Sequence, residues 1–282
     1  TYKIVQGYIH AKAPKGLIGN VIKFPKISVG ATENLIIAAS FAKGKTILRN
    51  CAIEPEVKDL INFLRKMGCN IKWTGQRTIT IIGVQVLQNL KYKIMFDRIE
   101  AVTYMIASAL TGGNLKITNI NPKIINTEIN ILKRIGTKIK IKGNEINIVG
   151  KSKIKNIKLK TAPYPGFPTD LQAQLMVLLC KADGRSEISE KIFENRFMHA
   201  PELNRMGAKI KIFGNKAIIE GNINFKAAEL MATDLRASVS LILAALTAKG
   251  KSIINRIYHL DRGYEQIEKK LSNVGANIRR IS

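Results

Sequence analysis

The distribution of apolar and polar residues along the chain predicts alternating helices and strands. Residues 171–180 and 237–246 are apolar on nearly every side of a helix with 3.6 residues per turn, which is typical of helices buried in the middle of a domain. Residues 252–256 alternate between apolar and polar positions, as a strand with one buried face does. Helices packed on such strands indicate the α/β fold class.

Four segments of the chain share one pattern, and this repetition is the strongest sign of its organisation. Each segment has a helix with a polar or acidic start, a strand, a second helix and two strands, with a glycine expected at the end of each helix. By subtraction, the glycines expected after the first helices are 69, 71 and 66 residues apart: Gly44, Gly113, Gly184 and Gly250. Those expected after the second helices are 68, 71 and 68 residues apart: Gly68, Gly136, Gly207 and Gly275. The chain therefore predicts four complete copies of one unit.

The helix starts recur at the same point of each copy. In the fourth copy, Thr233 and Asp234 are expected to cap a helix over residues 235–248, which Gly250 closes. The corresponding starts are Ser28-Val29-Gly30, Asp97-Arg98 and Thr169-Asp170. Repetition brings several helix N-termini toward a common centre, and these ends favour anions, so the pattern indicates an anion site.

Composition predicts a domain boundary near Phe96, where the strand-rich stretches 78–86 and 91–96 give way to a helix that begins at Asp97. The first domain, residues 1–95, would hold one copy of the unit after a hairpin at residues 2–13. The second domain, residues 96–282, would hold the other three copies.

The formal net charge of +26 raises the question of nucleic-acid binding. However, the basic residues are spread along the chain, and aromatic residues amount to only 6%, too few for a stacking platform. We therefore expect an anionic small molecule as the ligand, and no nucleic acid. No apolar run reaches the roughly 18 residues of a membrane helix. Cys51, Cys69 and Cys180 lack metal-site spacing and indicate a reducing compartment.

A proline-rich loop at residues 161–168 places an acid where a stiff segment meets a helix. Its three prolines exclude the loop from a central strand or a helix interior, because proline fixes φ and lacks an N–H donor. Thr169 is then the expected N-cap, and Asp170 lies in the first turn. A rigidly placed carboxylate suits proton transfer; alternatively, Asp170 only stabilises the start of its helix.

Four motifs resemble the enolpyruvyltransferase family, and within it the UDP-N-acetylglucosamine 1-carboxyvinyltransferases. The motifs are TAPYPGFPTDLQAQ (161–174), FENRFMH (193–199), MATDLRAS (231–238) and RIYHLDRGYE (256–265). The resemblance extends through nearly the whole chain and includes KISVGAT (26–32) and EPE (54–56). It implies an inside-out α/β barrel of two similar domains, the first of them incomplete here.

The resemblance implies enolpyruvyl transfer from phosphoenolpyruvate to the 3-hydroxyl of UDP-N-acetylglucosamine, the first committed step of peptidoglycan synthesis. The reaction is cytoplasmic and uses no metal and no organic cofactor. Asp170 matches the base that takes the proton of the attacking sugar hydroxyl. Arg262 matches the arginine that binds phosphoenolpyruvate, for which its planar fork is suited. The alternative for Arg262 is a surface pair with Asp261 or Glu265.

Further substrate contacts are implied at matched positions of the motifs. Arg196, Asp234 and Arg236 would give electrostatic support to an anionic transition state, or alternatively form an ion-pair network between repeats. Ile192 would offer a backbone group to the acetamido sugar. The expected contacts to the uridyl and diphosphate groups are Lys26, Ser28, Val29 and Gly30.

The resemblance also implies that roughly two units of the family's amino-terminal part are missing from this chain. In the family that part carries a cysteine that serves as general acid and covalent enolpyruvyl carrier. The isolated chain is therefore expected to be inactive and to need the missing segment in trans. The alternatives are an inactive remnant, one half of a split enzyme, or a transferase similar to enolpyruvylshikimate phosphate synthase.

Overall fold

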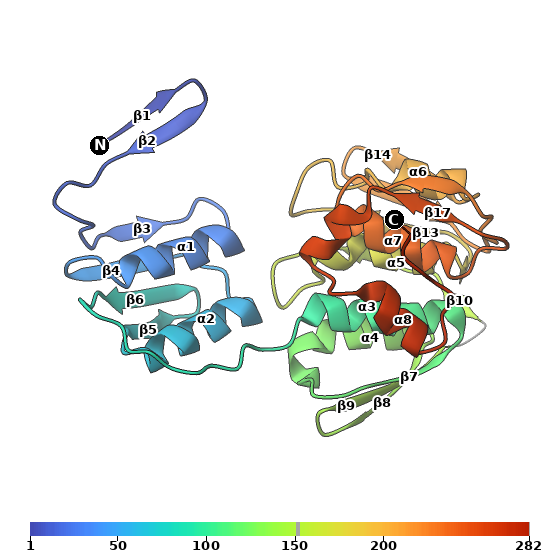
Figure 1. Cartoon of the computed structure of the whole chain (residues 1–282), viewed down its shortest axis with the longest axis horizontal. Coiled ribbons are helices and arrows are strands. Elements are labelled where there is room, and N and C mark those ends of the chain that lie inside the picture. Colours follow the sequence, from blue (N-terminus) through green and yellow to red (C-terminus); the bar gives the residue numbers. More distant parts are fainter. Residues whose placement is uncertain (151–152, 282) are drawn as a thin grey trace. The chain divides into compact units, whose positions relative to one another are not determined.

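The structure is a computed structural model that describes residues 1–150 and 153–281. The chain divides into two compact units, Thr1–Met95 (unit 1) and Phe96–Ser282 (unit 2) (Figure 1). Both units combine helices with strands, and each has its own apolar core. The α/β class predicted from the sequence is confirmed.

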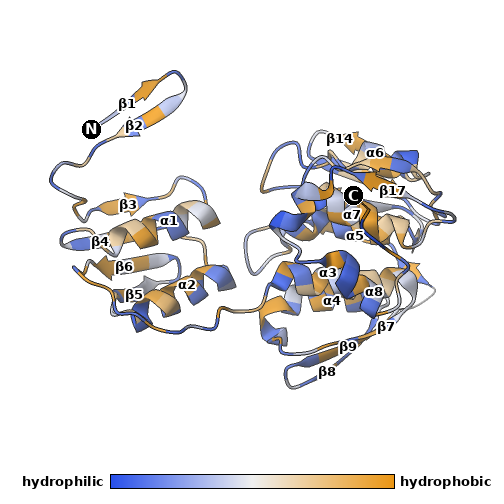
Figure 2. Cartoon of the chain, in the orientation of Figure 1, coloured by the Kyte–Doolittle hydropathy of each residue, from blue (hydrophilic) through white to orange (hydrophobic). Residues whose placement is uncertain are grey.

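Unit 1 consists of an exposed hairpin and one complete copy of the repeat. The hairpin strands β1 (Tyr2–Val5) and β2 (Tyr8–Ala11) pair antiparallel, and all their residues are exposed although Figure 2 shows hydrophobic residues in both. The copy contains β3 (Val21–Lys23), α1 (Val29–Ala39), β4 (Lys45–Arg49), α2 (Pro55–Lys66), β5 (Asn70–Gly75) and β6 (Thr78–Ile82). Its sheet has the order β3-β4-β6-β5, with β3 and β4 parallel and the other neighbours antiparallel.

The end of unit 1 differs from the prediction, because residues 91–96 contain no strand. This segment instead lies against α2. The Tyr92 hydroxyl donates to Asp59 Oδ1 at 2.8 Å, and the Met95 N–H donates to Asp59 Oδ2 at 3.2 Å. A side-chain acceptor on a helix therefore binds this segment in place of the neighbouring strand that a strand would need.

Unit 2 contains three further copies of the repeat. The second copy has α3 (Arg98–Thr111), β7 (Asn114–Ile117), the 3-10 helix η1 (Pro122–Ile125), α4 (Asn126–Arg134), β8 (Lys138–Lys142) and β9 (Glu145–Val149). The third has β10 (Ile154–Lys155), β11 (Lys158–Lys160), η2 (Thr169–Leu171), α5 (Gln172–Leu179), β12 (Ala182–Asp183), β13 (Ser186–Ser189), α6 (Ala200–Arg205), β14 (Lys209–Phe213) and β15 (Lys216–Glu220). The fourth has β16 (Glu229–Met231), α7 (Leu235–Ala245), β17 (Ile253–Asn255), η3 (Ile257–Arg262) and α8 (Ile267–Asn273).

The sheets reveal how complete each copy is. The third copy has the order β11-β13-β15-β14, which repeats the arrangement of β3-β4-β6-β5, and the second copy has β7-β9-β8. The fourth copy has only β16 and β17, and no hairpin follows α8 among the residues that the structure describes. The prediction of four complete copies is therefore wrong for the fourth. Residues 276–281 follow Gly275 but pair with no described strand, and a strand requires such a neighbour for its backbone groups.

The two sets of glycines play different parts. Gly68, Gly136, Gly207 and Gly275 all have φ between 93° and 109° and lie two residues beyond α2, α4, α6 and α8, as predicted for helix-ending glycines. In the other set, Gly44, Gly184 and Gly250 have positive φ but follow the helices by five residues, so Gly250 does not cap α7. These helices end in tight turns. At the end of α5, for example, the Lys181 N–H donates to the Leu178 carbonyl at 3.0 Å. In α3 the left-handed cap is Gly112 rather than Gly113.

The centre of unit 2 is built from the three first helices of its copies. All eight residues of α5 are buried, and α5 packs on both α3 and α7, which are themselves largely buried. This confirms the prediction that helices apolar on every side lie inside a domain. Nowhere in residues 1–150 or 153–281 is there a helix with both the length and the apolar character needed to span a bilayer.

Candidate active site

Asp170 lies where the proline-rich loop meets the central helix of unit 2. Within the loop, the Ala162 N–H donates to the Phe167 carbonyl at 3.0 Å and the Gly166 N–H to the Pro163 carbonyl at 2.8 Å. The loop then enters η2, whose middle residue is Asp170, and α5 begins directly afterwards. The chain thus places this carboxylate on a short, internally bonded turn.

The expected N-cap role of Thr169 is wrong. Its hydroxyl donates to Glu190 Oε2 at 2.9 Å, and no side chain caps either η2 or α5 among the described residues. A buried acceptor from another segment has replaced the local backbone partner. Because Asp170 does not cap the helix either, its carboxylate is left for other partners.

Two arginines bind this carboxylate. Arg236 Nε donates to Asp170 Oδ1 at 2.7 Å, and Arg236 Nη2 contacts the same oxygen. Arg196 Nη1 lies 3.6 Å from that oxygen. The Asp170 side chain is 43% exposed, whereas that of Arg196 is 16% exposed. The structure therefore forms a cluster of one accessible acid between two arginines, in which the predicted residues Asp170, Arg196 and Arg236 meet.

Each arginine is positioned by its own element. Asp234 caps α7, since its Oδ1 accepts from the Arg236 and Ala237 N–H groups at 2.7 and 2.9 Å, and this fixes the start of the helix that carries Arg236. The Arg196 guanidinium lies 4.0 Å from the centre of the Phe193 ring. Burial and the neighbouring Arg236 lower the pKa of Arg196, and Asp170 opposes this shift. Two cations so close together favour an additional anion beside them.

The other predicted residues of unit 2 lie in different settings. Arg262 ends η3, and no hydrogen bond or ion pair joins it to Asp170 or Arg196 in the described part of the chain. Its suggested partner Asp261 is instead bonded to Arg280, whose Nη2 lies 2.6 Å from Asp261 Oδ1. The Ile192 N–H donates to Glu190 Oε1 at 2.8 Å. The backbone group of Ile192 that could bind the acetamido sugar is therefore its carbonyl.

The predicted phosphate contacts of unit 1 surround the start of α1. Ser28 caps this helix, and its hydroxyl oxygen accepts from the Ala31 N–H at 3.3 Å. Val29 and Gly30 form the first turn, and Lys26 lies two residues before the cap. A helix start with free N–H groups and a nearby lysine has the features of an anion-binding end.

Comparisons with known proteins identify the family of the chain. Residues 3–271 match the family model of EPSP synthase (3-phosphoshikimate 1-carboxyvinyltransferase). The chain is 75% identical to a UDP-N-acetylglucosamine 1-carboxyvinyltransferase of Pelagibacter ubique over 281 residues, which are 100% of this chain and 67% of that protein. It is 50% identical to the enzyme of the same name from Bartonella tribocorum, with 99% of this chain and 65% of that protein covered.

This chain belongs to the UDP-N-acetylglucosamine 1-carboxyvinyltransferase family. The chain spans about two thirds of the length of these curated relatives. Solved structures show the same fold: the enolpyruvyl transferase NikO from Streptomyces tendae is 25% identical with a TM-score of 0.89, over 99% of this chain and 69% of that one. EPSP synthase from Acinetobacter baumannii is 22% identical with a TM-score of 0.74, over 95% of this chain and 64% of that one.

One buried acid beside the cluster was missed by sequence reasoning. Glu190 follows β13 and is 2% exposed, and its carboxylate accepts from both Thr161 and Thr169. The only signal in the sequence was an acid directly after a predicted strand, and many solvent-exposed acids share it. Pairing between residues 21 positions apart or more cannot be read from such a pattern.

A histidine and the cysteines of the chain are buried and apart from this chemistry. His199 is 2% exposed, and its Nε2 atom has no hydrogen-bond partner among the described residues. Burial lowers the pKa of His199 to about 4, although Asp234 opposes the shift. Burial likewise raises the pKa of Cys180 to about 12 and that of Cys51 to about 11. Neutral thiols of this kind are poor nucleophiles, as expected from their apolar surroundings.

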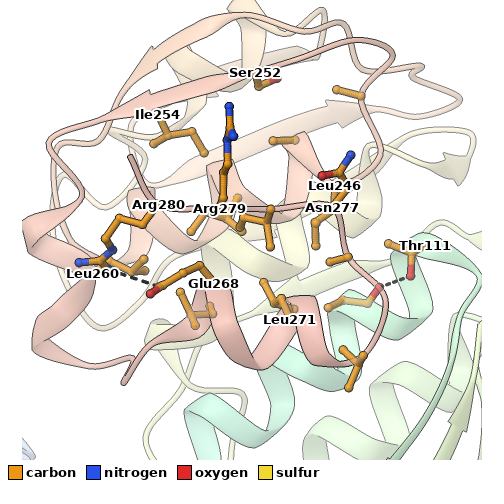
Figure 3. A pocket seen from close by; sticks show the side chains of 18 of the residues that line it. Thr111, Leu246, Ser252, Ile254, Leu260, Glu268, Leu271, Asn277, Arg279 and Arg280 are labelled. Carbon is orange, nitrogen blue, oxygen red and sulfur yellow. Dashed lines mark hydrogen bonds and ion pairs between the residues drawn. The ribbon is translucent and has the colours of Figure 1, made fainter. Parts of the chain in front are cut away.

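A cavity of about 1200 Å³ lies elsewhere in unit 2 (Figure 3). Helices α3, α7 and α8, strand β17 and residues 276–281 line it, with apolar side chains such as Leu260 and Leu271. Arg280 and Glu268 form an ion pair at 3.5 Å on its wall. Neither Asp170 nor either arginine of the cluster is among the described residues that line it, so this cavity is separate from the candidate active site.

Proposed function

We propose that the protein containing this chain transfers the enolpyruvyl group of phosphoenolpyruvate to the 3-hydroxyl of UDP-N-acetylglucosamine. The observation that carries the proposal is the 75% identity, over the whole chain, to a relative named for this reaction. The cluster of Asp170 with Arg196 and Arg236 supports it, because it joins an accessible base to cations suited to a polyanionic substrate. This reaction opens peptidoglycan synthesis, and we assign it to the cytoplasm.

In this proposal the residues of unit 2 divide the chemistry among them. Asp170 takes the proton of the sugar hydroxyl as its oxygen attacks phosphoenolpyruvate. Arg236 and Arg196 orient the carboxylate of Asp170 and offset the negative charge of the phosphate and carboxylate groups. Arg262, through its planar fork, binds phosphoenolpyruvate, and the Ile192 carbonyl accepts from the acetamido group.

In unit 1, the proposed role is recognition of the nucleotide. The start of α1, with Ser28, Val29 and Gly30, receives the diphosphate on its free N–H groups, and Lys26 adds a cation. We assign unit 1 as part of the first enolpyruvyltransferase domain and unit 2 as the second domain.

The proposal includes a partner. We infer that the cysteine that carries the enolpyruvyl group in the family lies in the third of the relatives' length outside the match. The chain alone is then inactive, and activity returns when the missing segment is added or fused.

The test is a phosphate-release assay with phosphoenolpyruvate and UDP-N-acetylglucosamine, run with the chain alone, with the added segment, and with shikimate 3-phosphate as the competing acceptor. Release from the sugar nucleotide only when the segment is present is the expected result. Release with shikimate 3-phosphate instead would assign the chain to the other transferase. No release in any of these mixtures would support an inactive remnant.

A further inference from the structure

Glu190 joins the two loops that carry Asp170 and Arg196. Its Oε1 accepts from the Thr161 hydroxyl at 2.8 Å, the Ile192 N–H at 2.8 Å and the Phe193 N–H at 3.2 Å. Its Oε2 accepts from the Thr169 hydroxyl at 2.9 Å. One carboxylate therefore bonds to both ends of the proline-rich loop and to the segment that follows β13.

The backbone around Glu190 is fixed independently of its side chain. The Glu190 N–H donates to the Asn215 carbonyl at 2.8 Å, and the Asn215 side-chain amide donates to the Glu190 carbonyl at 3.1 Å. The Thr161 N–H donates to the Ser189 carbonyl at 3.0 Å. The sheet thus supplies a rigid base from which the Glu190 side chain reaches the two loops.

Two of the residues that donate to Glu190, Thr169 and Phe193, lie next to Asp170 and Arg196. Thr169 is the residue directly before Asp170, and the Phe193 ring lies under the Arg196 guanidinium at 4.0 Å. Asp170 and Arg196 in turn meet at 3.6 Å. A shift of either loop therefore changes the geometry of the acid and of its arginine together.

Glu190 is unsuited to act on the substrate itself. It is 2% exposed, and both of its oxygens already accept hydrogen bonds from the protein. Burying a carboxylate costs free energy unless hydrogen-bond donors compensate it. The donors around Glu190 supply this compensation, and the carboxylate in turn holds them in place.

We propose that Glu190 is a positioning residue that sets the distance between Asp170 and Arg196 for proton transfer. This inference rests on the function proposed above. Glutamine is the conservative variant, because its carbonyl oxygen still accepts from the donors at Oε1 while its amide faces Thr169, whose hydroxyl can accept as well as donate. Alanine removes all four bonds.

The experiment compares Glu190→Ala, Glu190→Gln and the control Glu187→Ala in the complete protein. Glu187 lies on β13, which ends directly before Glu190, and its carboxylate faces Lys216 at 3.7 Å. Glu190→Ala should lower kcat by ~10²-fold, since a displacement near 1 Å costs about that much. The KM for phosphoenolpyruvate should change much less than kcat, because Arg262, which binds phosphoenolpyruvate in the proposed function, lies outside both loops. Glu190→Gln should stay within about 5-fold of the parent.

Several results would overturn this role. These are an unchanged kcat in Glu190→Ala, an equal loss in the alanine and glutamine variants, or a loss that Glu187→Ala shares. If Glu190→Ala does not fold, Thr169→Val removes only the donor to Oε2, and a kcat loss of about 10-fold with a normal melting temperature is then expected. An unchanged kcat in Thr169→Val would contradict the proposal equally.

Amide hydrogen exchange on the present chain tests the role of Glu190 without requiring transferase activity. The Ile192 and Phe193 amides should exchange faster in Glu190→Ala and remain slow in Glu190→Gln. Absence of transferase activity from the complete protein, with the added segment, would contradict the proposed function. Unchanged exchange at these two amides would contradict the role of Glu190.

Discussion

The same helix occurs in two very different surroundings in this chain. Helix α1 of unit 1 and helix α5 of unit 2 each follow the first strand of a four-stranded sheet with the same strand order. All eight residues of α5 are buried, whereas α1 buries Thr32, Ile36 and Ala39 and leaves Ile37 47% exposed. Phe41, just beyond α1, is 51% exposed.

Both helices are rich in apolar residues, although α1 also carries Glu33 and Asn34, and their neighbours differ. Helix α5 is flanked by α3 and α7, the corresponding helices of its sister copies, and these cover the sides that its own sheet leaves open. Unit 1 contains a single copy, so α1 has its own sheet and α2 but no sister helix within the unit. A repeat whose first helix is apolar on every side depends on other copies to bury it.

The largest effect should come from the helix start that carries the base. In the complete protein, Asp170→Asn keeps the shape of the side chain but cannot accept a proton, so kcat should fall by ~10²–10⁴-fold. Affinity for UDP-N-acetylglucosamine, measured by calorimetry, should change only a few-fold. Asp183→Asn, an exposed acid on β12, is the control and should keep the parent kcat. Equal turnover in Asp170→Asn and the parent would remove Asp170 from the chemistry.

Burial of the two helices can be compared directly by truncation. Leu175→Ala in α5 should cost about 2–5 kcal/mol of unfolding free energy, because Leu175 is 0% exposed. Ile37→Ala in α1 should cost about 0.5 kcal/mol or less. Urea unfolding followed by circular dichroism reports both units together, and the fluorescence of Trp73, the only tryptophan of the sequence, reports unit 1 alone. Similar costs at both positions would show that α1 is as well covered as α5.

The second helices of the two copies differ in their N-cap residue, which is Glu54 in α2 and the buried His199 in α6. The pKa of His199 is lowered from 6.5 to about 4, so the unfolded chain binds a proton that the folded chain does not. Stability should therefore be complete above about pH 6.5, decline as the pH falls toward 4, and lose about 3 kcal/mol from this group.

Denaturant unfolding between pH 7 and 4 measures this decline, and His199→Gln is the comparison. The variant should lose about 3 kcal/mol less than the parent over this range, because carboxylates titrate equally in both proteins. Identical pH profiles would show that His199 is protonated in the folded protein as readily as in the unfolded one.

The smallest effect concerns η3, which lies between β17 and α8 and has no counterpart between β4 and α2. Arg262→Lys should raise the KM for phosphoenolpyruvate by about 10-fold, since an ammonium cannot reproduce the two-pronged contact of a guanidinium. Arg185→Lys, whose side chain is 69% exposed, serves as the control in steady-state assays. A KM unchanged by Arg262→Lys would exclude Arg262 from the phosphoenolpyruvate site.

Features set by local pattern could be predicted, and features set by distant partners could not. The apolar helices and the glycines after the second helices follow from periodicity and from the need for positive φ, as Gly68 and Gly275 illustrate. The pairing of Asp170 with Arg236 spans 66 positions, and Thr169 bonds to Glu190 across 21. Tertiary hydrogen bonds of this kind replaced the local cap that the sequence favoured.

Each of the first helices in unit 2 has an aspartate at its start, and these aspartates have different roles. Asp97 and Asp234 each accept two backbone N–H groups and stabilise α3 and α7, while Asp170 faces two arginines and leaves α5 without a side-chain cap. A missing cap costs a helix about 1 kcal/mol, which the complete burial of α5 can absorb. Burial by the neighbouring copies therefore stabilises α5 enough that it needs no side-chain cap. Asp170, the acid at its start, is thus left to face the two arginines.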